Sequence, residues 1–347
     1  MRNTLQLHFP QLRNRQEVLD DILSKENLKG TYETWNEIQK EHFLDICSGV
    51  RGVKMLYDGV FKEIFNPDVV PERLEELLSL LLEQKVKILK VLPNDSTRIA
   101  EESSLLIMDI VVQLEDGSIA NVECQKIGYA FPGQRAACYS ADLLLRQYKR
   151  VKGEKGKSFS YKDIKKVYSI IFYEQSPREF QTYPAEWLHR SKQQLNTGAQ
   201  MELLQEFLFI PLDIVQKIYQ NNGVSNKLEA WLVFLSSDEP EVIVRLLKEY
   251  PQFREMYEDV YELCLNTERV MEMFSKELLE LDKNTVQYMI DEMQDEIAAQ
   301  KAALKVKDAK LQEKDNQLQE KDNQLQEKDA ENARLRALLK QVGIKED

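Results

Sequence analysis

The final part of the chain repeats a seven-residue pattern almost without change. Leu311 to Gln317 reads LQEKDNQ, Leu318 to Gln324 repeats the same letters, and Leu325 to Glu331 reads LQEKDAE. A period of seven places the leucines on one stripe of an α-helix, as in a coiled coil. The repeat therefore predicts a heptad-repeat helical tail over residues 296–347.

The second core position of this heptad is polar. When the leucines are assigned to position d, aspartates such as Asp315 fall at a, and when they are assigned to a, lysines such as Lys314 fall at d. A half-apolar seam favours weak association, so we expect a homo-oligomer formed through residues 296–347. A single mobile helix is the alternative interpretation.

Composition limits the class of protein. Of the 347 residues, 43% are hydrophobic and 31% are charged, with a net charge of -12, which is typical of a globular chain. Charged residues interrupt the leucine-rich stretch from Leu74 to Leu92, and the N-terminus has no apolar run of signal-peptide length. We therefore expect a cytoplasmic protein that does not enter a membrane.

Cysteine and histidine offer little material for a metal site. The four cysteines show no CxxC pairing, and the three histidines share no metal-ligand spacing. The scattered cysteines also do not indicate a disulfide framework, which fits a reducing compartment. Any active site is therefore expected to consist of carboxylates.

Hydrophobic periodicity divides the rest of the chain into three parts. We predict a helical segment over residues 1–50, an α/β core over 51–180 and an all-α region over 181–295. Within the core, the predicted order of elements is α-α-β-β-α-β. These elements are helices at Val53 to Phe65 and Pro71 to Lys85, strands at Leu105 to Leu114 and Ile119 to Lys126, a helix at Gln134 to Lys149 and a strand at Lys166 to Tyr173.

A single acid interrupts the first of these strands. Leu105 to Val112 reads LLIMDIVV, which is typical of a central strand buried on both faces, and its acid is Asp109. Burying an unpaired carboxylate is costly, so Asp109 is expected to be paired, to bind a metal or to face a cleft. In the next strand, period-two alternation places three polar residues on one face: Asn121, Glu123 and Gln125.

The loop between the two strands decides whether their acids meet. A three-residue loop of residues 115–117, with Gly117 in the left-handed conformation, sets Asp109 directly opposite Glu123. A two-residue turn would instead set Ile110 against Glu123. We favour the three-residue loop and therefore predict that the two carboxylates face each other.

Two opposed carboxylates repel each other, and a divalent cation would neutralise both. Magnesium prefers oxygen ligands, uses one or two carboxylates and completes its shell with waters and phosphate oxygens. The pair therefore indicates a magnesium site for hydrolysis of a phosphodiester. The alternative is a structural acid pair beside a buried base or a helix end.

Several short motifs around these acids resemble those of one family. They are YDGVFKEIF at 57–65, Asp109 itself, VECQK at 122–126, FPGQR at 131–135 and Tyr139-Ser140. Asp109, followed after thirteen residues by ECQ, is similar to the split D…(D/E)xK motif of the PD-(D/E)xK nucleases. The whole set, over about residues 40 to 175, resembles the PD-(D/E)xK nuclease family transposases, also called Rpn recombination-promoting nucleases.

The resemblance implies a restriction-endonuclease-like α-β-β-β-α-β core that binds magnesium, or manganese, in a cleft and hydrolyses DNA. It implies that Asp109 and Glu123 are metal ligands and that the main-chain carbonyl of Cys124 is a candidate third ligand. It also implies that Gln125 takes the position of the motif's lysine.

Gln125 is a departure from the family pattern. A glutamine orients water through hydrogen bonds but supplies no cation. The neighbouring Lys126 points to the opposite face of the strand, so only a bulge would let it act in place of a motif lysine. Met108 replaces the motif's proline, which carries no chemistry.

The first helix of the core is expected to supply another acid. Four residues fall at i, i+3, i+4 and i+7 on one helical stripe: Asp58, Phe61, Lys62 and Phe65. Glu63 lies on a different face and is expected to be exposed to solvent. We therefore favour Asp58 over Glu63 as a catalytic residue. The alternative is an acid placed at the helix N-terminus by the helix dipole.

The helix after the second strand borders the predicted cleft with basic and aromatic residues. The candidate DNA-binding residues are Arg135, Tyr139, Arg146, Lys149 and Arg150. The last three lead into a basic patch with nine lysines and arginines against three acids between Asp142 and Lys166. Ordinary surface arginines on an amphipathic helix are the alternative.

Three functional hypotheses follow. The first is a magnesium-dependent DNA endonuclease associated with recombination or a mobile element. The second is a nuclease-fold protein without efficient turnover that acts as a DNA-binding or assembly module, motivated by Gln125, the acidic net charge and the tail. The third is a scaffold that assembles through its tail without a nucleic acid partner.

Overall fold

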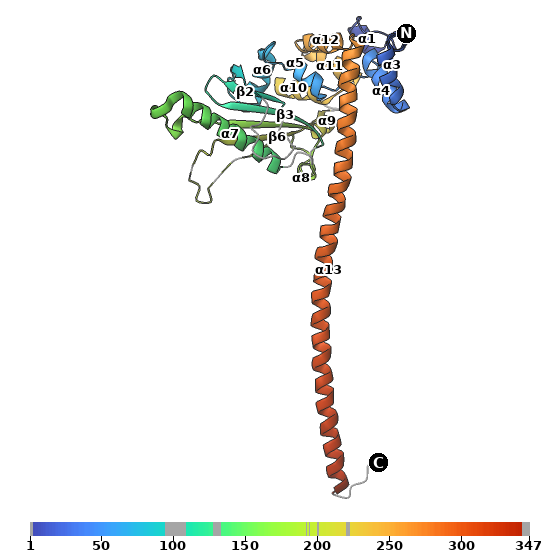
Figure 1. The fold of residues 1–347 in the computed structure, drawn as a ribbon, viewed down its shortest axis with the longest axis vertical. Helices are drawn as coiled ribbons and strands as arrows, with labels where there is room; N and C mark the ends of the chain where they lie inside the picture. The colour runs from blue at the N-terminus through green and yellow to red at the C-terminus, as the bar shows by residue number, and fades with distance from the viewer. Residues whose placement is uncertain are drawn as a thin grey trace. The chain divides into compact units, whose positions relative to one another are not determined.

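The structure is a computed structural model that describes residues 3–93, 109–127, 133–191, 193, 195–199, 201–219 and 223–341. The chain divides into two compact units, Met1–Asn284 and Thr285–Asp347. The first unit contains a six-stranded sheet with helices on both faces, and the second consists of helix (Figure 1). The two units are described separately below.

Four helices form the N-terminal segment, as predicted for residues 1–50. They are α1 (Thr4–His8), α2 (Arg15–Ser24), α3 (Glu26–Thr34) and α4 (Glu37–Ser48). Asn3, Asn14 and Asn36 each begin a helix with a reciprocal capping box, which satisfies backbone N–H groups at the first turn. At the other end of α4, Gly49 adopts the left-handed conformation that helix termination requires.

The sheet has the strand order β1-β2-β3-β4-β6-β5. Its strands are β1 (Ile88–Val91), β2 (Ile110–Leu114), β3 (Ile119–Ile127), β4 (Val167–Gln175), β5 (His189–Arg190) and β6 (Gln205–Pro211). The pairs β1-β2, β2-β3 and β5-β6 are antiparallel, whereas β3-β4 and β4-β6 are parallel. The helix α7 (Gly133–Lys155) makes the crossover that the parallel pair β3-β4 requires.

The predicted core elements are present with shifted ends. The first two helices are α5 (Asp58–Ile64) and α6 (Pro71–Leu82), and both are shorter than predicted. The first predicted strand is observed only as β2, because residues 94–108 lie outside the described part of the chain. The helix α7 continues six residues beyond its predicted end at Lys149.

Two predictions about the architecture were wrong. The order α-α-β-β-α-β omits β1, so the described core reads α-α-β-β-β-α-β. The region 181–295 is not all-α, because β5 and β6 lie within it and β6 joins the sheet beside β4. The short helix α8 (Arg178–Gln181) precedes β5. The helices that follow β6 agree with the prediction: α9 (Leu212–Tyr219), α10 (Lys227–Ser236), α11 (Pro240–Glu249) and α12 (Phe253–Leu263).

The two faces of the sheet have separate hydrophobic cores because strand residues alternate between them. On one face, Ala120, Val122 and Phe172 pack in the large core that the N-terminal helices, α5, α6 and α9 to α12 share. On the other face, Ile119 and Val167 pack against α7. Figure 1 shows α7 lying along its own face of the sheet, apart from α5, α6 and α10. Side chains at the end of the sheet can therefore meet both layers.

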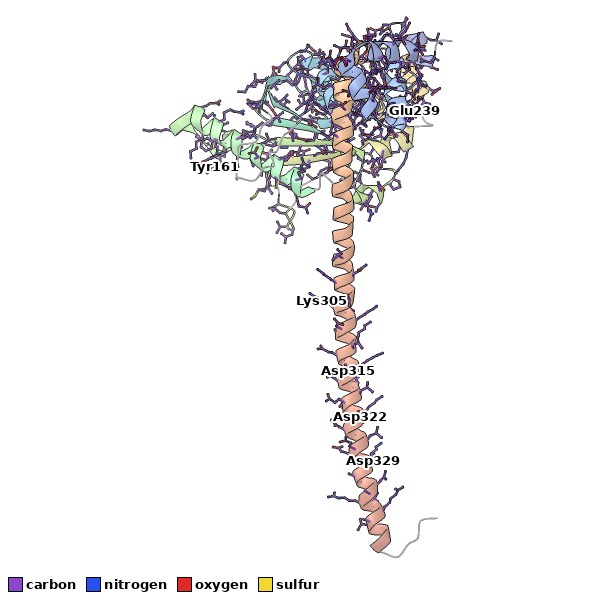
Figure 2. All side chains as sticks on the ribbon, turned by 45° about the vertical axis from the view of Figure 1, so that its right-hand side comes forward. Tyr161, Glu239, Lys305, Asp315, Asp322 and Asp329 are labelled. Carbon is purple, nitrogen blue, oxygen red and sulfur yellow. The ribbon has the colours of Figure 1, made fainter. Side chains whose placement is uncertain are left out.

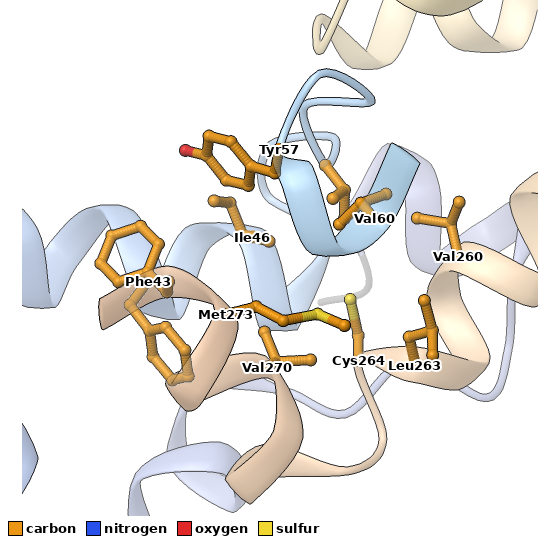
Figure 3. Close-up of a pocket in the computed structure, with 11 residues that line it drawn as sticks. Phe43, Ile46, Tyr57, Val60, Val260, Leu263, Cys264, Val270 and Met273 are labelled. Atoms are coloured by element: carbon orange, nitrogen blue, oxygen red, sulfur yellow. The ribbon is translucent and has the colours of Figure 1, made fainter. Parts of the chain in front are cut away.

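The helix α13 (Thr267–Gln341) begins inside the first unit. Its Met273 and Phe274 line a small apolar cavity of about 20 Å³ together with residues of α4, α5 and α12 (Figure 3). Gly59 allows this close packing, since a Cβ atom on it would lie only 2.8 Å from Met273. The start of α13 is thus fixed against the N-terminus of α5.

The second unit is helical up to Gln341, which confirms the predicted helix but does not test its self-association. Leucines of the heptad stripe, such as Leu311 and Leu318, are each 58% exposed in the single chain. Figure 2 shows Asp315, Asp322 and Asp329 spaced along the same helix. Within the described residues, no helix has the length and apolarity needed to span a membrane.

Candidate active site

The hairpin between β2 and β3 has the predicted register. Ile110 pairs with Val122, and the Leu114 N–H donates to the Ser118 carbonyl at 2.9 Å. Gly117 closes the three-residue loop with a φ of 88°. Continuing this pairing by one residue sets position 109 opposite position 123, as the sequence predicted.

Asp109 lies immediately before β2, at the end of the sheet. Its Oδ2 accepts a hydrogen bond from the Cys124 N–H at 2.7 Å. Its Oδ1 lies 3.6 Å from the Nζ of Lys62, which approaches from α5. Asp109 therefore contacts both β3 and α5.

Glu123 is almost completely buried, with 1% of its surface exposed. Its Oε1 accepts a hydrogen bond from the side-chain amide of Asn121 at 3.0 Å, and its Oε2 accepts one from the amide of Gln125 at 3.3 Å. The three side chains share one face of β3, in agreement with the predicted alternation. Gln125 therefore holds Glu123 through a hydrogen bond and does not supply the positive charge of a motif lysine.

Burial dominates the electrostatics of both carboxyl groups. Desolvation raises the pKa of Asp109 most strongly, against the opposing effects of the Cys124 N–H and Lys62. Desolvation also raises the pKa of Glu123, and the negative charge of Asp109 raises it further. The two groups are thus close enough to disfavour ionisation of each other, and a cation between them would reverse that effect.

The donor set fits a hard divalent cation. Two carboxylates with raised pKa values supply the oxygen ligands that magnesium and manganese accept. In the described part of the chain, no group of three or more His, Cys, Asp or Glu side chains could hold a metal. Main-chain oxygens, waters or substrate oxygens would therefore have to complete the coordination of an ion held by Asp109 and Glu123.

Cys124 contributes its main chain to the site. Its N–H binds Asp109, and its side chain packs against the larger core on the other face of the sheet. Burial raises the pKa of the thiol far above the ordinary range, so the sulfur stays protonated. The role of its carbonyl as a third metal ligand stays a prediction.

The structure places Asp58 next to Asp109 through a shared lysine. Asp58 is the first residue of α5, and its Oδ1 lies 2.5 Å from the Nζ of Lys62. The same ammonium group approaches Asp109. In contrast, Glu63 is exposed and pairs with Arg269 at 2.5 Å, as expected for a residue on another face of the helix.

Lys62 was not identified from the sequence as a site residue. Burial lowers its pKa, but its hydrogen bond to Asp58 and the charge of Asp109 outweigh this effect, so the pKa is raised and the ammonium stays charged. The signal in the sequence was its spacing of four residues from Asp58, which places both on one helical face. The ammonium group of Lys62 therefore gives the site a positive charge, which Gln125 at the position of the motif lysine lacks.

Lys126 lies on the opposite face of β3 from Glu123, as predicted. It is 9% exposed and pairs with Glu277 of α13, which is 3% exposed. Its Nζ lies 5.2 Å from the centre of the Tyr57 ring. The other oxygen of Glu277 accepts the backbone N–H of Asp58 at 2.7 Å. Glu277 thus joins β3 to the start of α5.

Arg135 and Tyr139 lie one turn apart on α7 and contact each other. The guanidinium of Arg135 donates to the Tyr139 hydroxyl at 2.8 Å, and its positive charge lowers the pKa of Glu123 against the larger effect of burial. Tyr139 is buried between α7 and the sheet. Arg135 is exposed, whereas Tyr139 is buried. Any role of Tyr139 in DNA binding would therefore be to position Arg135.

The remaining candidate DNA-binding residues lie further along α7. Arg146 lies 2.6 Å from Asp142 and donates to the Pro93 carbonyl at 3.1 Å. Arg146 and Arg150 line a groove of about 340 Å³ with Lys90. Lys149 is exposed. Their contact with DNA stays a prediction.

Comparison with known proteins gave one match. A family model described as PD-(D/E)XK nuclease family transposase matches residues 55–293. This range includes the hairpin, α5, α7, the whole sheet and the start of α13 up to and beyond Glu277. Searches of the curated proteins and of the solved structures gave no match.

Proposed function

Because the chain belongs to the PD-(D/E)XK nuclease family transposases, we propose that it is a magnesium-dependent DNA endonuclease that acts in recombination or on a mobile element. The observation that carries the proposal is a pair of desolvated carboxyl groups, Asp109 just before β2 and Glu123 on β3, which the register of the hairpin sets opposite each other. The family supports a nuclease-type hydrolase in general, and its members typically use divalent metals. A mixed six-stranded sheet with helices on both faces is compatible with such a fold.

Asp109 and Glu123 would hold the magnesium ion, and manganese would take the same ligands. The ion would supply charge neutralisation at the scissile phosphate and a nucleophilic water. Asn121 and Gln125 fix the orientation of Glu123 through its two oxygens. Arg135 adds positive charge beside this carboxylate, where a DNA phosphate would approach.

Lys62 would provide the positive charge that a motif lysine provides in related sites. Its ammonium lies between Asp58 and Asp109, so it can neutralise one carboxylate and face a phosphate at the same time. Asp58 would then act by positioning Lys62. This arrangement gives Gln125 an orienting role without requiring it to carry charge.

The direct test is nicking of supercoiled plasmid by the full-length protein. We expect nicking with magnesium or manganese and no nicking with EDTA. Nicking that continues in EDTA would remove the metal from the mechanism. Inactivity with both metals, combined with retained DNA binding, would favour the alternative of a DNA-binding or assembly module, which the replacement of the motif lysine by Gln125 motivates.

Replacing Lys62 by methionine should lower the cleavage rate by about 100- to 1,000-fold, because one preorganised charge that faces the reacting phosphate is lost. Lys62→Arg keeps the charge and should retain a larger share of the rate. The matched control is Lys40→Met, which removes a partly exposed lysine of α4 that is paired with Glu37. Equal cleavage by wild type and Lys62→Met, measured by plasmid nicking in magnesium, would show that Lys62 has no catalytic role.

We also propose that the tail forms a homo-oligomer through residues 296–347. Its stripe of exposed leucines would be buried between copies of the chain. Replacing Leu311, Leu318 and Leu325 together by asparagine should shift the full-length protein to monomer in sedimentation equilibrium. Replacing the same number of tail glutamines by asparagine is the control, and a wild-type protein that is monomeric at all concentrations would contradict the proposal.

A further inference from the structure

Three aromatic rings contact one another where α7 ends. Tyr148 of α7 stacks on Tyr161 with a centroid distance of 5.9 Å and an interplanar angle of 9°. Phe159 meets both rings edge-on, at 5.6 Å from Tyr148 and 5.4 Å from Tyr161. Tyr161 is 76% exposed, so one side of this cluster is open to solvent. Figure 2 places Tyr161 beside the end of α7.

The loop that carries two of these rings has a defined structure. It contains two short 3₁₀ turns, Gly156–Ser158 and Tyr161–Asp163. Ser160 caps the second turn, and Asp163 lies 2.6 Å from the Nζ of Lys155 at the end of α7. The loop is thus held back against the helix, which keeps Phe159 and Tyr161 beside Tyr148. The rings form a preorganised surface that binding would not have to order.

Positive charge surrounds this aromatic cluster. Lys152 donates to the Tyr148 hydroxyl at 2.8 Å, and its Nζ lies 5.1 Å from the centre of the same ring. Exposed lysines flank it on the helix and on the loop: Lys149, Lys157, Lys162 and Lys165. Of the acids in the patch, Asp142 is paired with Arg146 and Asp163 with Lys155. The local charge is therefore positive although the whole chain carries -12.

A groove of about 580 Å³ lies directly against the cluster. Tyr148, Tyr161 and Lys162 line it, with Leu144 and Ile164 contributing apolar surface. Its single acid, Glu202, lies 3.6 Å from the Nζ of Lys166. The volume falls in the range of pockets that hold small planar ligands. The groove thus combines an open aromatic face, an apolar wall and nearby cations.

We propose that the aromatic cluster of Tyr148, Phe159 and Tyr161 is a binding site for an unpaired base of single-stranded DNA. Stacking on aromatic rings together with cations along the backbone is how proteins bind single strands without reading sequence. A duplex offers phosphates to the same lysines but no free base to the rings. The inference rests on the proposed function in taking DNA as the polymer that is bound.

The position of the cluster relative to the carboxylates supports this ligand. Arg135, beside Glu123, and Tyr148 lie on the same helix, and thirteen residues of α-helix span about 20 Å. Arg146 lies between them on α7. A single strand of a few nucleotides that leaves the cleavage site along α7 would therefore be long enough to reach the rings. The site would hold a displaced or overhanging strand rather than the scissile phosphate.

Binding of a labelled oligo-dT strand to the full-length protein in EDTA tests the proposal without any turnover. Tyr161→Ala should weaken single-strand affinity by about 5- to 100-fold, as expected for the loss of one stacked base. The same variant should leave affinity for a duplex nearly unchanged. Tyr161→Phe keeps the ring and should bind as wild type does. Tyr183→Ala, at another exposed tyrosine, is the matched control.

A strand containing 2-aminopurine gives a second readout. Stacking quenches the emission of this base, so the wild type should quench it and Tyr161→Ala should not.

Unchanged single-strand affinity in Tyr161→Ala, or an equal loss for single strand and duplex, would overturn the proposal. If that happens while the wild type still nicks plasmid in magnesium, only the base-binding site fails. Tyr161-dependent single-strand binding without nicking would support the base-binding site while the nuclease proposal fails.

Discussion

Replacing Glu123 by glutamine should abolish metal-dependent cleavage and, at the same time, raise the free energy of unfolding of the metal-free protein. Loss of a residue that only orients a metal ligand typically lowers metal affinity or activity by about 10- to 100-fold. Loss of a charged ligand itself is therefore expected to lower the cleavage rate by more than about 100-fold. The gain in stability follows from removing a buried charge that Asp109 repels. It should be on the order of 1–2 kcal/mol above neutral pH.

Glutamine has nearly the size of Glu123 and keeps one of its two acceptor oxygens. Its new amide group needs an acceptor, and the buried Oδ1 of Asn121 makes no hydrogen bond in the described structure. A flip of the Asn121 amide would let this oxygen accept from the glutamine, and the Asn121 amide nitrogen would then take the place of the oxygen that had no partner. The cost of the substitution is therefore limited to one amide group, because size and the number of hydrogen bonds are retained.

The stability difference between Glu123→Gln and wild type should depend on pH. Burial raises the folded-state pKa of Glu123 and Asp109 above the values of about 4 in the unfolded chain. Below about pH 4 the carboxyl groups are neutral in both states, so their contribution to stability is fully present. As pH rises from there toward and through the folded-state pKa values, the unfolded chain releases protons that the folded protein still holds, so this stability is lost, and the loss is complete above those values. Wild type should therefore weaken with rising pH in EDTA more than the variant.

Chemical denaturation across pH, with and without magnesium, measures this effect. Magnesium should stabilise wild type and leave Glu123→Gln unchanged, since a ligand stabilises only the state that binds it. Glu115→Gln, an exposed acid in the same hairpin, is the matched control. A variant that is less stable than wild type above neutral pH in EDTA would contradict the electrostatic explanation.

Glu277→Ala should produce a large loss of stability. The substitution leaves Lys126 buried without its carboxylate and removes the acceptor of the Asp58 N–H. Breaking a buried ion pair by removing one partner typically costs about 3–5 kcal/mol. The urea midpoint of the full-length protein should fall accordingly, and plasmid nicking should fall with it because β3 and α5 lose their connection.

A double variant separates buried charge from lost packing. Lys126→Met combined with Glu277→Leu removes both charges and should recover most of the stability that Glu277→Ala loses. Glu272→Ala, which breaks an exposed pair with Lys276 on the same helix, should cost less than about 0.5 kcal/mol. Equal urea midpoints for Glu277→Ala and Glu272→Ala would show that the Lys126 pair is not buried in solution.

Local patterns in the sequence were sufficient to predict the register of the hairpin between β2 and β3. The alternation of β3 and the glycine of the loop fix the register, because Gly117 supplies a conformation that other residues adopt only with strain. Asp109 and Glu123 could therefore be brought together without a structure. The short strands were missed for the converse reason: β1 has four residues and β5 has two, which is too few for a periodic signal. β6 was missed because it runs directly into α9, so its apolar residues were assigned to the helical region that follows.

The rest of the site depends on contacts between distant parts of the chain. Glu277 is 219 positions from Asp58, and no spacing rule connects them. The pairing of Lys126 with Glu277 likewise needs the packing of α13 against α5, which the close approach at Gly59 permits. Only Lys62 had a local signal, since it lies one turn from Asp58.

The contact of Glu277 with Lys126 and Asp58 also has a consequence for the order in which the candidate site forms. The chain is synthesised from its N-terminus, so β3 and α5 leave the ribosome long before residue 277 does. Until then neither the pair of Lys126 with Glu277 nor the hydrogen bond from the Asp58 N–H to Glu277 can form. A nascent chain that already contains every predicted metal ligand therefore still lacks the contact that joins β3 to α5. For the proposed nuclease, this order of synthesis would delay DNA cleavage until most of the chain has been made.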